Sequence, residues 1–219
     1  MLFMNTDFCI ISNDCWGAEI YIERKIAYNT PFVGLFIPPS HFVKMANNLQ
    51  AYLATELVFV KETAFQDYKE LYKKEQYPIA LLGDVEIHFL HYTDETQARS
   101  KWNRRLNRMP KDTSTWFIKG CDREVSDWNQ LQASWNSIPF NKIFFSAKKR
   151  KELAHAVTIT ESYDEYVTDG KALYNLSKDY FEIDQWIDSK GNSWELKTLP
   201  FLRNLNFQFK KLKYKINKL

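Results

Sequence analysis

Residues 7–17 read DFCIISNDCWG, and this stretch decides the fold class. Its first part, residues 7–12, is a compact apolar run bounded by polar residues, which predicts a short buried strand. Asn13 and Asp14 follow as a polar turn, and either side chain could cap a helix that continues to about Ala27. A buried strand that passes through a polar turn into a helix is typical of a layered α/β fold.

The same alternation of strands and helices continues along the chain. We expect strands over 32–37, 57–60, 79–82, 85–92, 115–119, 142–146 and, at a sheet edge, 157–160. We expect helices over 40–54, 64–75, 94–109, 123–136 and 179–187. The pattern predicts one three-layer α/β/α domain over residues 1–200, with a mostly parallel, mixed sheet.

Composition excludes several classes of protein. The 219 residues are 45% hydrophobic and 26% charged, with only 6 Gly and 7 Pro, which excludes a disordered or collagen-like chain. The three cysteines are odd in number and form no CxxC pair, so we expect neither a disulfide framework nor a cysteine zinc site. No apolar run approaches the roughly 20 residues that cross a bilayer, and the N-terminus lacks a basic signal region. We therefore expect a cytoplasmic protein.

The last 19 residues differ from the rest in charge. Residues 201–219 carry six Lys or Arg and no acid, whereas the whole chain has a net charge of +3. An apolar seam with heptad-like spacing runs through them: Leu202, Leu205, Phe209, Leu212, Ile216 and Leu219. This predicts a basic amphipathic helix that attaches peripherally to an anionic membrane surface, at the inner face of the cytoplasmic membrane. The alternative is that the helix docks on the domain or on a second subunit.

The turn at 12–17 is the first candidate site. Ser12 or Cys15 could act as a nucleophile, and backbone N–H groups at the helix start could hold an oxyanion or phosphate. A helix N-terminus favours a thiolate, so Cys15 is the more reactive cysteine expected. The candidate substrate-binding residues around them are Asn13, Asp14, Trp16 and Gly17. The alternative is that the polar residues are only helix caps and that Cys15 is a small buried side chain.

The segment LGDVEIHFLHY over 82–92 is the second candidate site. In a strand, Glu86 and His88 share one face, with Asp84 at its edge, while His91 projects from the other face. His88 or His91 could move a proton, with Asp84 and Glu86 orienting the imidazole or contacting substrate. The spacing lacks the specificity of a metal motif, so no metal is expected; the alternative is a set of hydrogen-bonded core residues.

The helix containing KWNRRLNRM, residues 101–109, is the third candidate. Its cations recur at three- and four-residue spacings and form one stripe, beside an apolar stripe that includes Trp102. Arginine guanidinium groups suit bidentate contacts with phosphate or carboxylate, so Arg104, Arg105 and Arg108 could hold an anionic donor. The alternative is a solvated helix face.

Four strings in this order, ISNDCWG, PFVGLFI, LGDVEIHFLHY and KWNRRLNRM, together with the later IPFNKIFF, resemble a bacterial family catalogued as DUF1919. The resemblance covers about Asp7 to Phe145. Members are often labelled exopolysaccharide biosynthesis proteins, so the resemblance implies an α/β fold and a role in polysaccharide synthesis. The family turn usually reads SNNCWGG, whereas this chain has Asp14 and Ala18. The turn is also similar to the GNCQ turn of certain capsule-synthesis acyltransferases.

The resemblance implies a role in cell-surface polysaccharide synthesis, and the candidate sites permit transfer chemistry, so we expect a sugar-modifying transferase, for glycosyl or acyl transfer. Its expected partners are a nucleotide-sugar or acyl-CoA donor and a saccharide acceptor, with no separate cofactor. No nucleic-acid motif accompanies the basic segment, so nucleic acid is not an expected partner. The alternative is a non-catalytic accessory protein of the polysaccharide assembly machinery.

Overall fold

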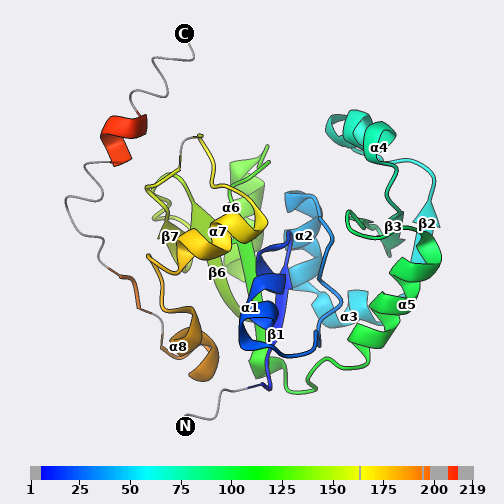
Figure 1. The fold of residues 1–219 in the computed structure, drawn as a ribbon, viewed down its shortest axis with the longest axis horizontal. Coiled ribbons are helices and arrows are strands. Elements are labelled where there is room, and N and C mark those ends of the chain that lie inside the picture. The colour runs from blue at the N-terminus through cyan, green and yellow to red at the C-terminus, as the bar shows by residue number, and fades with distance from the viewer. Residues whose placement is uncertain (1–5, 163, 194, 198–206, 212–219) are drawn as a thin grey trace.

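A four-stranded parallel sheet forms the centre of the molecule (Figure 1). The computed structural model describes residues 6–162, 164–193, 195–197 and 207–211. The strands lie in the order β1-β5-β6-β7, and each neighbouring pair is parallel. Their bounds are β1 Cys9–Ser12, β5 Trp116–Cys121, β6 Asn141–Ser146 and β7 Ala156–Thr158.

Helices cover both faces of this sheet, because its strands are apolar on both sides. Ile10 and Phe117 lie in one hydrophobic core, while their chain neighbours Ile11 and Ile118 lie in the other. The first core includes residues of α1 (Trp16–Arg24), α7 (Gly170–Ser177) and α8 (Ile183–Asp188), and the second includes residues of α2 (Pro39–Asn47) and α6 (Trp128–Ser137). The three-layer α/β/α fold expected from the sequence is confirmed.

The remaining strands form a second, antiparallel sheet in the order β2-β3-β4. Parallel pairing is thus confined to the first sheet, and antiparallel pairing of strands to the second. β3 and β4 form a tight hairpin, which turns at Gly83 with a φ of +62°. The bounds in this part are α3 Leu49–Leu53, β2 Leu57–Val60, α4 Lys69–Glu75, β3 Ile79–Leu82, β4 Val85–His88 and α5 Glu95–Leu106. Side chains of β3 and β4 belong to the same core as α2 and α6.

Two expected strands differ in the structure, and both differences shape the site. The segment 32–37 forms only an isolated bridge, between Phe36 and His88. Gly34, with a φ of +72°, interrupts the extended backbone, and the flanking prolines cannot donate ladder hydrogen bonds. β4 ends at His88, so 89–92 forms a turn rather than the end of a strand.

The expected helices are present with shorter bounds. The expected helix over 40–54 is divided into α2 and α3 at Asn48, which has a non-helical backbone. In α5, Asp94 is the N-cap and accepts a hydrogen bond from the Gln97 N–H at 2.7 Å. α7 has no counterpart among the helices expected from the sequence.

The C-terminal helix is described only in part. Residues 207–211 are helical, with Phe207 buried and Phe209 61% exposed. The rest of the helix predicted over 201–219 lies outside the described residues. Within the described part of the chain, no helix is long and apolar enough to span a membrane.

Candidate functional site

A hollow of about 520 Å³, here termed the main hollow, lies at the carboxyl ends of β1 and β5. The turn at 13–15, which follows β1, and residues 121–124, which end and follow β5, form one side. Tyr68, Tyr77 and His91 contribute from the part of the chain that carries the antiparallel sheet, and Asp169 contributes from the start of α7. Carboxyl ends of parallel strands are the usual position of ligands in open α/β sheets.

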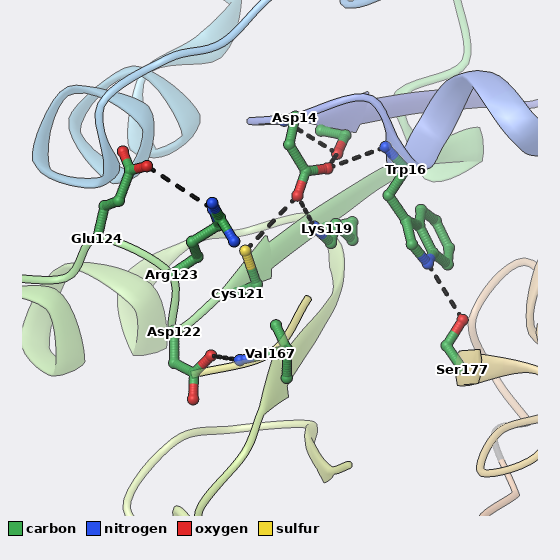
Figure 2. Close-up of polar contacts among 10 residues, drawn as sticks. Asp14, Trp16, Lys119, Cys121, Asp122, Arg123, Glu124, Val167 and Ser177 are labelled. Atoms are coloured by element: carbon green, nitrogen blue, oxygen red, sulfur yellow. Dashed lines mark hydrogen bonds and ion pairs between the residues drawn. The ribbon is translucent and has the colours of Figure 1, made fainter. Parts of the chain in front are cut away.

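A buried ion pair holds the shape of the turn after β1 (Figure 2). Lys119 of β5 is fully buried and donates to Asp14 Oδ2 at 2.5 Å. The other carboxylate oxygen of Asp14 accepts hydrogen bonds from the Ser12 hydroxyl at 2.8 Å and the Trp16 N–H at 3.0 Å. Asp14 therefore joins the strand, the neighbouring strand and the first turn of α1.

Both members of the pair are charged. Burial, the largest effect, would raise the pKa of Asp14, but Lys119 and the hydrogen bonds together lower it below 3.8. Burial likewise favours a lower pKa for Lys119, and the charge of Asp14 outweighs this and raises the pKa above 10.5. The pair is thus a fixed structural element of the site rather than a proton donor near neutral pH.

Ser12 is fully buried, and its hydroxyl proton is directed at Asp14. It does not line the main hollow. In this arrangement Ser12 supports the turn, and its neighbours Asn13, Asp14 and Cys15 line the hollow instead.

Cys15 lies at the N-terminus of α1 and is partly exposed, while Cys9 and Cys121 are buried. Burial, together with the nearby charges of Asp14 and Asp169, raises the pKa of the Cys15 thiol to about 11. The thiol is therefore protonated near neutral pH, while the expectation that Cys15 is the most reactive of the three cysteines stays a prediction, supported by its partial exposure. Desolvation and neighbouring carboxylates outweigh the helix dipole, which contributes about 0.3–1 kcal/mol at such positions.

Asn13 presents an unsatisfied acceptor. The residue is 3% exposed, and its side-chain Oδ1 is buried without a hydrogen-bond partner among the described residues. Buried polar atoms are normally paired, so an unpaired one in the wall of a hollow indicates a position where a ligand or water donates. Asn13 Oδ1 is thus able to accept a hydrogen bond from a hydroxyl or amide group.

A loop from the far end of the chain closes one side of the hollow. Asp122 accepts a hydrogen bond from the Val167 N–H at 2.8 Å (Figure 2). It also accepts one from the Ala147 N–H at 2.7 Å. These bonds hold the segment before α7, and Gly170 packs so closely on Cys15 that an added Cβ would lie 3.2 Å from the Cys15 Cβ. Burial raises the pKa of Asp122.

The opposite wall carries a buried hydrogen-bonded chain of side chains. Glu86 Oε1 lies 2.7 Å from His88 Nε2, and His88 Nδ1 lies 3.0 Å from the Tyr77 hydroxyl oxygen. Glu86 and His88 are at most 1% exposed, and only Tyr77 of the three lines the main hollow. The predicted pairing of Glu86 and His88 on one face is confirmed, but His88 is separated from the hollow by Tyr77.

A second hollow, here termed the side hollow, has a volume of about 280 Å³ and shares Cys15, Glu19 and His91 with the main hollow. Lys101 and Arg105 of α5 line it together with aromatic and backbone groups. The Arg105 guanidinium lies 4.9 Å from the Tyr28 ring centroid and donates to the Tyr92 hydroxyl at 2.6 Å. Two cations beside two tyrosine rings form a surface suited to an anion that carries a ring.

The predicted site residues fall into two groups. Asn13, Asp14, Cys15 and His91 line the main hollow, and Arg105 lines the side hollow. The others lie outside both hollows: Ser12, Trp16, Gly17, Asp84, Glu86, His88, Trp102, Arg104 and Arg108. Trp102 is a core residue at 1% exposure, packed against Phe32 and Phe89, because it lies on the inner side of α5.

The arginine stripe of α5 is divided rather than continuous. Arg105 turns inward and is 8% exposed, while Arg104 and Arg108 are exposed to solvent. Asp84 is also remote from the hollows, because its carboxylate binds Lys44 and the Tyr52 hydroxyl at the β3–β4 turn. Trp16 is a core residue whose Nε1 donates to Ser177 Oγ at 3.1 Å, and Gly17 packs directly on Ile10.

Several residues of the site were not predicted from the sequence. They are Glu19, Tyr68, Tyr77, Lys119, Cys121, Arg123, Glu124 and Asp169. The sequence contains a signal for 121–124, since polar residues follow a predicted strand there just as they follow the first strand. Asp169 has no such signal, because its position depends on the loop that Asp122 anchors. The described residues contain no group of three His, Cys, Asp or Glu side chains placed to hold a metal ion.

Comparisons with known proteins bear on the same region. A family model for a domain of unknown function (DUF1919) matches residues 2–188. A Haemophilus influenzae protein, described as an uncharacterized protein, is 31% identical over 187 residues, which cover 85% of this chain and 80% of the relative. The family match includes every residue that lines the two hollows, whereas the basic segment 201–219 lies beyond it.

Proposed function

This chain belongs to the DUF1919 family, and from that premise and the geometry of the two hollows we propose that it is a sugar-modifying transferase of cell-surface polysaccharide synthesis. The observation that carries the proposal is the sharing of Cys15, Glu19 and His91 between the hollows. A transferase must hold a donor and an acceptor with their reacting atoms together, and two adjoining hollows with a common border meet that requirement.

The side hollow suits the donor. Lys101 and Arg105 supply positive charge, and the rings of Tyr28 and Tyr92 supply flat apolar surface. Nucleotide sugars and acyl-CoA share a diphosphate and an aromatic base, so both donor classes match these groups. Of the three predicted donor-binding arginines, Arg105 alone is retained in this proposal.

The main hollow suits a saccharide acceptor. Its walls combine aromatic side chains, Phe36, Tyr68 and Tyr77, with hydrogen-bonding groups such as Asn13 and Asp169. Sugars present both apolar C–H faces and hydroxyl groups, and ligand sites of this kind pair apolar walls with a few placed polar groups. The unpaired Asn13 Oδ1 is a natural acceptor for a sugar hydroxyl.

Direct transfer fits the surroundings better than a covalent enzyme intermediate. Ser12 is buried, and the Cys15 thiol is protonated near neutral pH because its pKa is raised to about 11. In direct transfer, the acceptor oxygen forms a bond to the transferred carbon while the bond to the leaving group breaks. His91, at the border of the two hollows, would contact the departing group and stabilise its negative charge.

Donor binding can be tested by isothermal titration of the full chain with nucleotide sugars and acetyl-CoA. We expect one donor class to saturate the protein, and Arg105→Gln or Lys101→Gln to weaken binding at least about tenfold. Arg104→Gln is the matched control, since it removes an exposed guanidinium on the same helix, outside both hollows. The proposal is contradicted if no donor binds the wild-type protein, or if Arg104→Gln weakens binding as much as Arg105→Gln.

A further inference from the structure

We propose that Tyr77 is a catalytic residue that accepts the proton of the acceptor hydroxyl and passes its own proton to His88. This inference rests on the proposed transferase function and adds a path for the proton. The path begins at Tyr77, which lines the main hollow, and continues to His88 and Glu86, which do not line it. It uses the buried pair Glu86–His88, which has no direct access to the hollow.

The direction of the path is set by Glu86. Its carboxylate accepts hydrogen bonds from the Thr63 hydroxyl and from the Ala64 N–H, the latter at 2.9 Å. Burial, the largest effect, raises its pKa, but the hydrogen bonds from His88, Thr63 and Ala64 outweigh it and lower the pKa below 4.5. Glu86 is therefore ionised near neutral pH, and an ionised carboxylate can only accept hydrogen bonds.

This fixes the tautomer of His88. Because Glu86 Oε1 is an acceptor at 2.7 Å, His88 Nε2 must carry the proton between them. In the neutral imidazole the other nitrogen, Nδ1, is then an acceptor, and the Tyr77 hydroxyl at 3.0 Å must donate to it. The lone pairs of the Tyr77 oxygen remain to accept a hydrogen bond from a ligand hydroxyl.

The surroundings favour a proton path over a solvated polar cluster. Phe36 and Tyr68 pack their ring edges on His88, with centroids 5.8 and 5.5 Å away. His88 is fully buried, and Tyr77 is 4% exposed where it lines the main hollow. Burial, aided by the charge of Glu86, raises the pKa of Tyr77 to about 12, so it is neutral and can both give and take a proton.

The step balances without any further reactant. As the acceptor oxygen bonds to the transferred carbon, its proton moves to the Tyr77 oxygen, and the Tyr77 proton moves to His88 Nδ1. The donor's leaving group departs with the electron pair of the broken bond. The imidazolium formed at His88 is stabilised by the Glu86 carboxylate at 2.7 Å. After the products leave, its extra proton passes through Tyr77 to solvent water that enters the open hollow.

The test combines two readouts on Tyr77→Phe, with Tyr72→Phe as the matched control. Tyr72 packs its ring against Tyr77, but its hydroxyl donates to the Lys61 carbonyl, and it does not line the main hollow. The first readout is the ¹⁵N spectrum of the His88 ring in the full chain near pH 7.5. The second is the composition of the surface polysaccharide in cells that lack the gene and carry each variant instead.

We expect the ¹⁵N spectrum of the wild type to show the Nε2–H tautomer, with the Nδ1 resonance shifted in Tyr77→Phe only. We expect Tyr72→Phe to restore the polysaccharide and Tyr77→Phe to leave at most about a hundredth of the modification, at equal levels of folded protein. An Nδ1–H tautomer in the wild type, or full restoration by Tyr77→Phe, overturns the Tyr77 assignment alone. A polysaccharide that is unchanged by deletion of the gene contradicts the proposed function itself, and the proton path with it.

Discussion

At the residue scale, Asp14 organises the turn after β1. Its two carboxylate oxygens accept hydrogen bonds from the Ser12 hydroxyl, the Trp16 N–H and the Lys119 ammonium group. One side chain therefore connects β1, α1 and the neighbouring strand β5. The Cys121 thiol also donates to it at 3.6 Å. These hydrogen bonds explain how a carboxylate and an ammonium group are both tolerated where little water reaches them.

Replacing Lys119 should therefore lower the stability of the fold. Lys119→Met leaves the Asp14 carboxylate buried without its counter-charge, and breaking such a pair costs about 3–5 kcal/mol of unfolding free energy. Lys44→Met is the control, because the Lys44–Asp84 pair is exposed and such pairs contribute about 0–1 kcal/mol. Urea denaturation measures both, and a loss below about 1 kcal/mol for Lys119→Met would mean that the pair does not stabilise the fold.

The same pair predicts a dependence on pH. The folded-state pKa of Asp14 is below 3.8, so its contribution is present above that value and is lost as the pH falls through the folded pKa. Lys119 has a folded pKa above 10.5, so its contribution is complete below 10.5 and is lost only as the pH rises through the folded pKa. Without Lys119, burial raises the pKa of Asp14, so the variant takes up the Asp14 proton at a higher pH than the wild type does. The difference in stability between wild type and Lys119→Met should therefore be largest above neutral pH and shrink as the pH falls and Asp14 becomes protonated in the variant.

The thiol of Cys15 should react slowly. Because its pKa is raised to about 11 by burial and by nearby carboxylates, alkylation by iodoacetamide should still accelerate between pH 8 and about 10. Asp169→Asn removes one of the raising charges and should speed the reaction at pH 8, while Cys15→Ser should abolish it. Rapid alkylation of wild type at pH 7 would show that the helix N-terminus lowers the pKa of Cys15 more than burial and the carboxylates raise it.

At the element scale, the position of α1 depends on the absence of a side chain at Gly17. A Cβ there would lie 2.8 Å from Ile10 Cγ2, closer than carbon atoms approach without movement. Gly17→Ala should displace α1 and cost about 1–3 kcal/mol through overpacking, which outweighs the gain of up to about 1 kcal/mol in helix propensity. Thermal unfolding tests this, with Ile22→Ala on the exposed side of α1 as a control that should change stability by less than about 0.5 kcal/mol.

The sequence predicts most elements because the local patterns and the tertiary fold agree. The runs around Ile10 and Phe144 are apolar on successive residues, which suits strands buried on both faces, and they are strands in the structure. The pattern cannot show that strands 57–60, 79–82 and 85–88 form a sheet separate from the parallel one, because strand pairing depends on residues distant in the sequence. It also could not show that Gly34 breaks the segment 32–37, since glycine conformation depends on the packing around it.

The attachment of the C-terminal segment 201–219 to an anionic membrane remains a prediction from the sequence. Its six cations and apolar seam should attach the full chain to vesicles that contain anionic lipid, and attachment should fall as salt rises, since charges are screened within about 10 Å at 0.1 M. A chain that ends at Pro200 should stay in the supernatant on co-sedimentation. Equal sedimentation of both chains, or equal binding to neutral lipid, would contradict this, and loss of a dimer on truncation would favour a helix–helix contact.

At the scale of the whole molecule, the site joins segments that are distant in sequence. The turn after β1, residues 121–124 after β5, the start of α7 and the wall that carries Tyr77 come together only in the folded chain. The sequence predicted that the turn and His91 belong to the site, because polar residues at the end of a strand or within an aromatic run can be recognised from the local sequence. Tyr77 and Asp169 were not predicted, because their roles arise from hydrogen bonds to His88 and from the loop that Asp122 holds.

The central claim is that this family member transfers a group to a saccharide. The most direct measurement is a mass spectrum of the surface oligosaccharide, isolated from cells that lack the gene, after incubation with the purified full chain and each candidate donor. The account predicts one donor that adds a single mass increment with the wild-type protein, and little or none with Arg105→Gln or Tyr77→Phe. An oligosaccharide that gains no mass from any donor, and that already matches the oligosaccharide of wild-type cells, would contradict it.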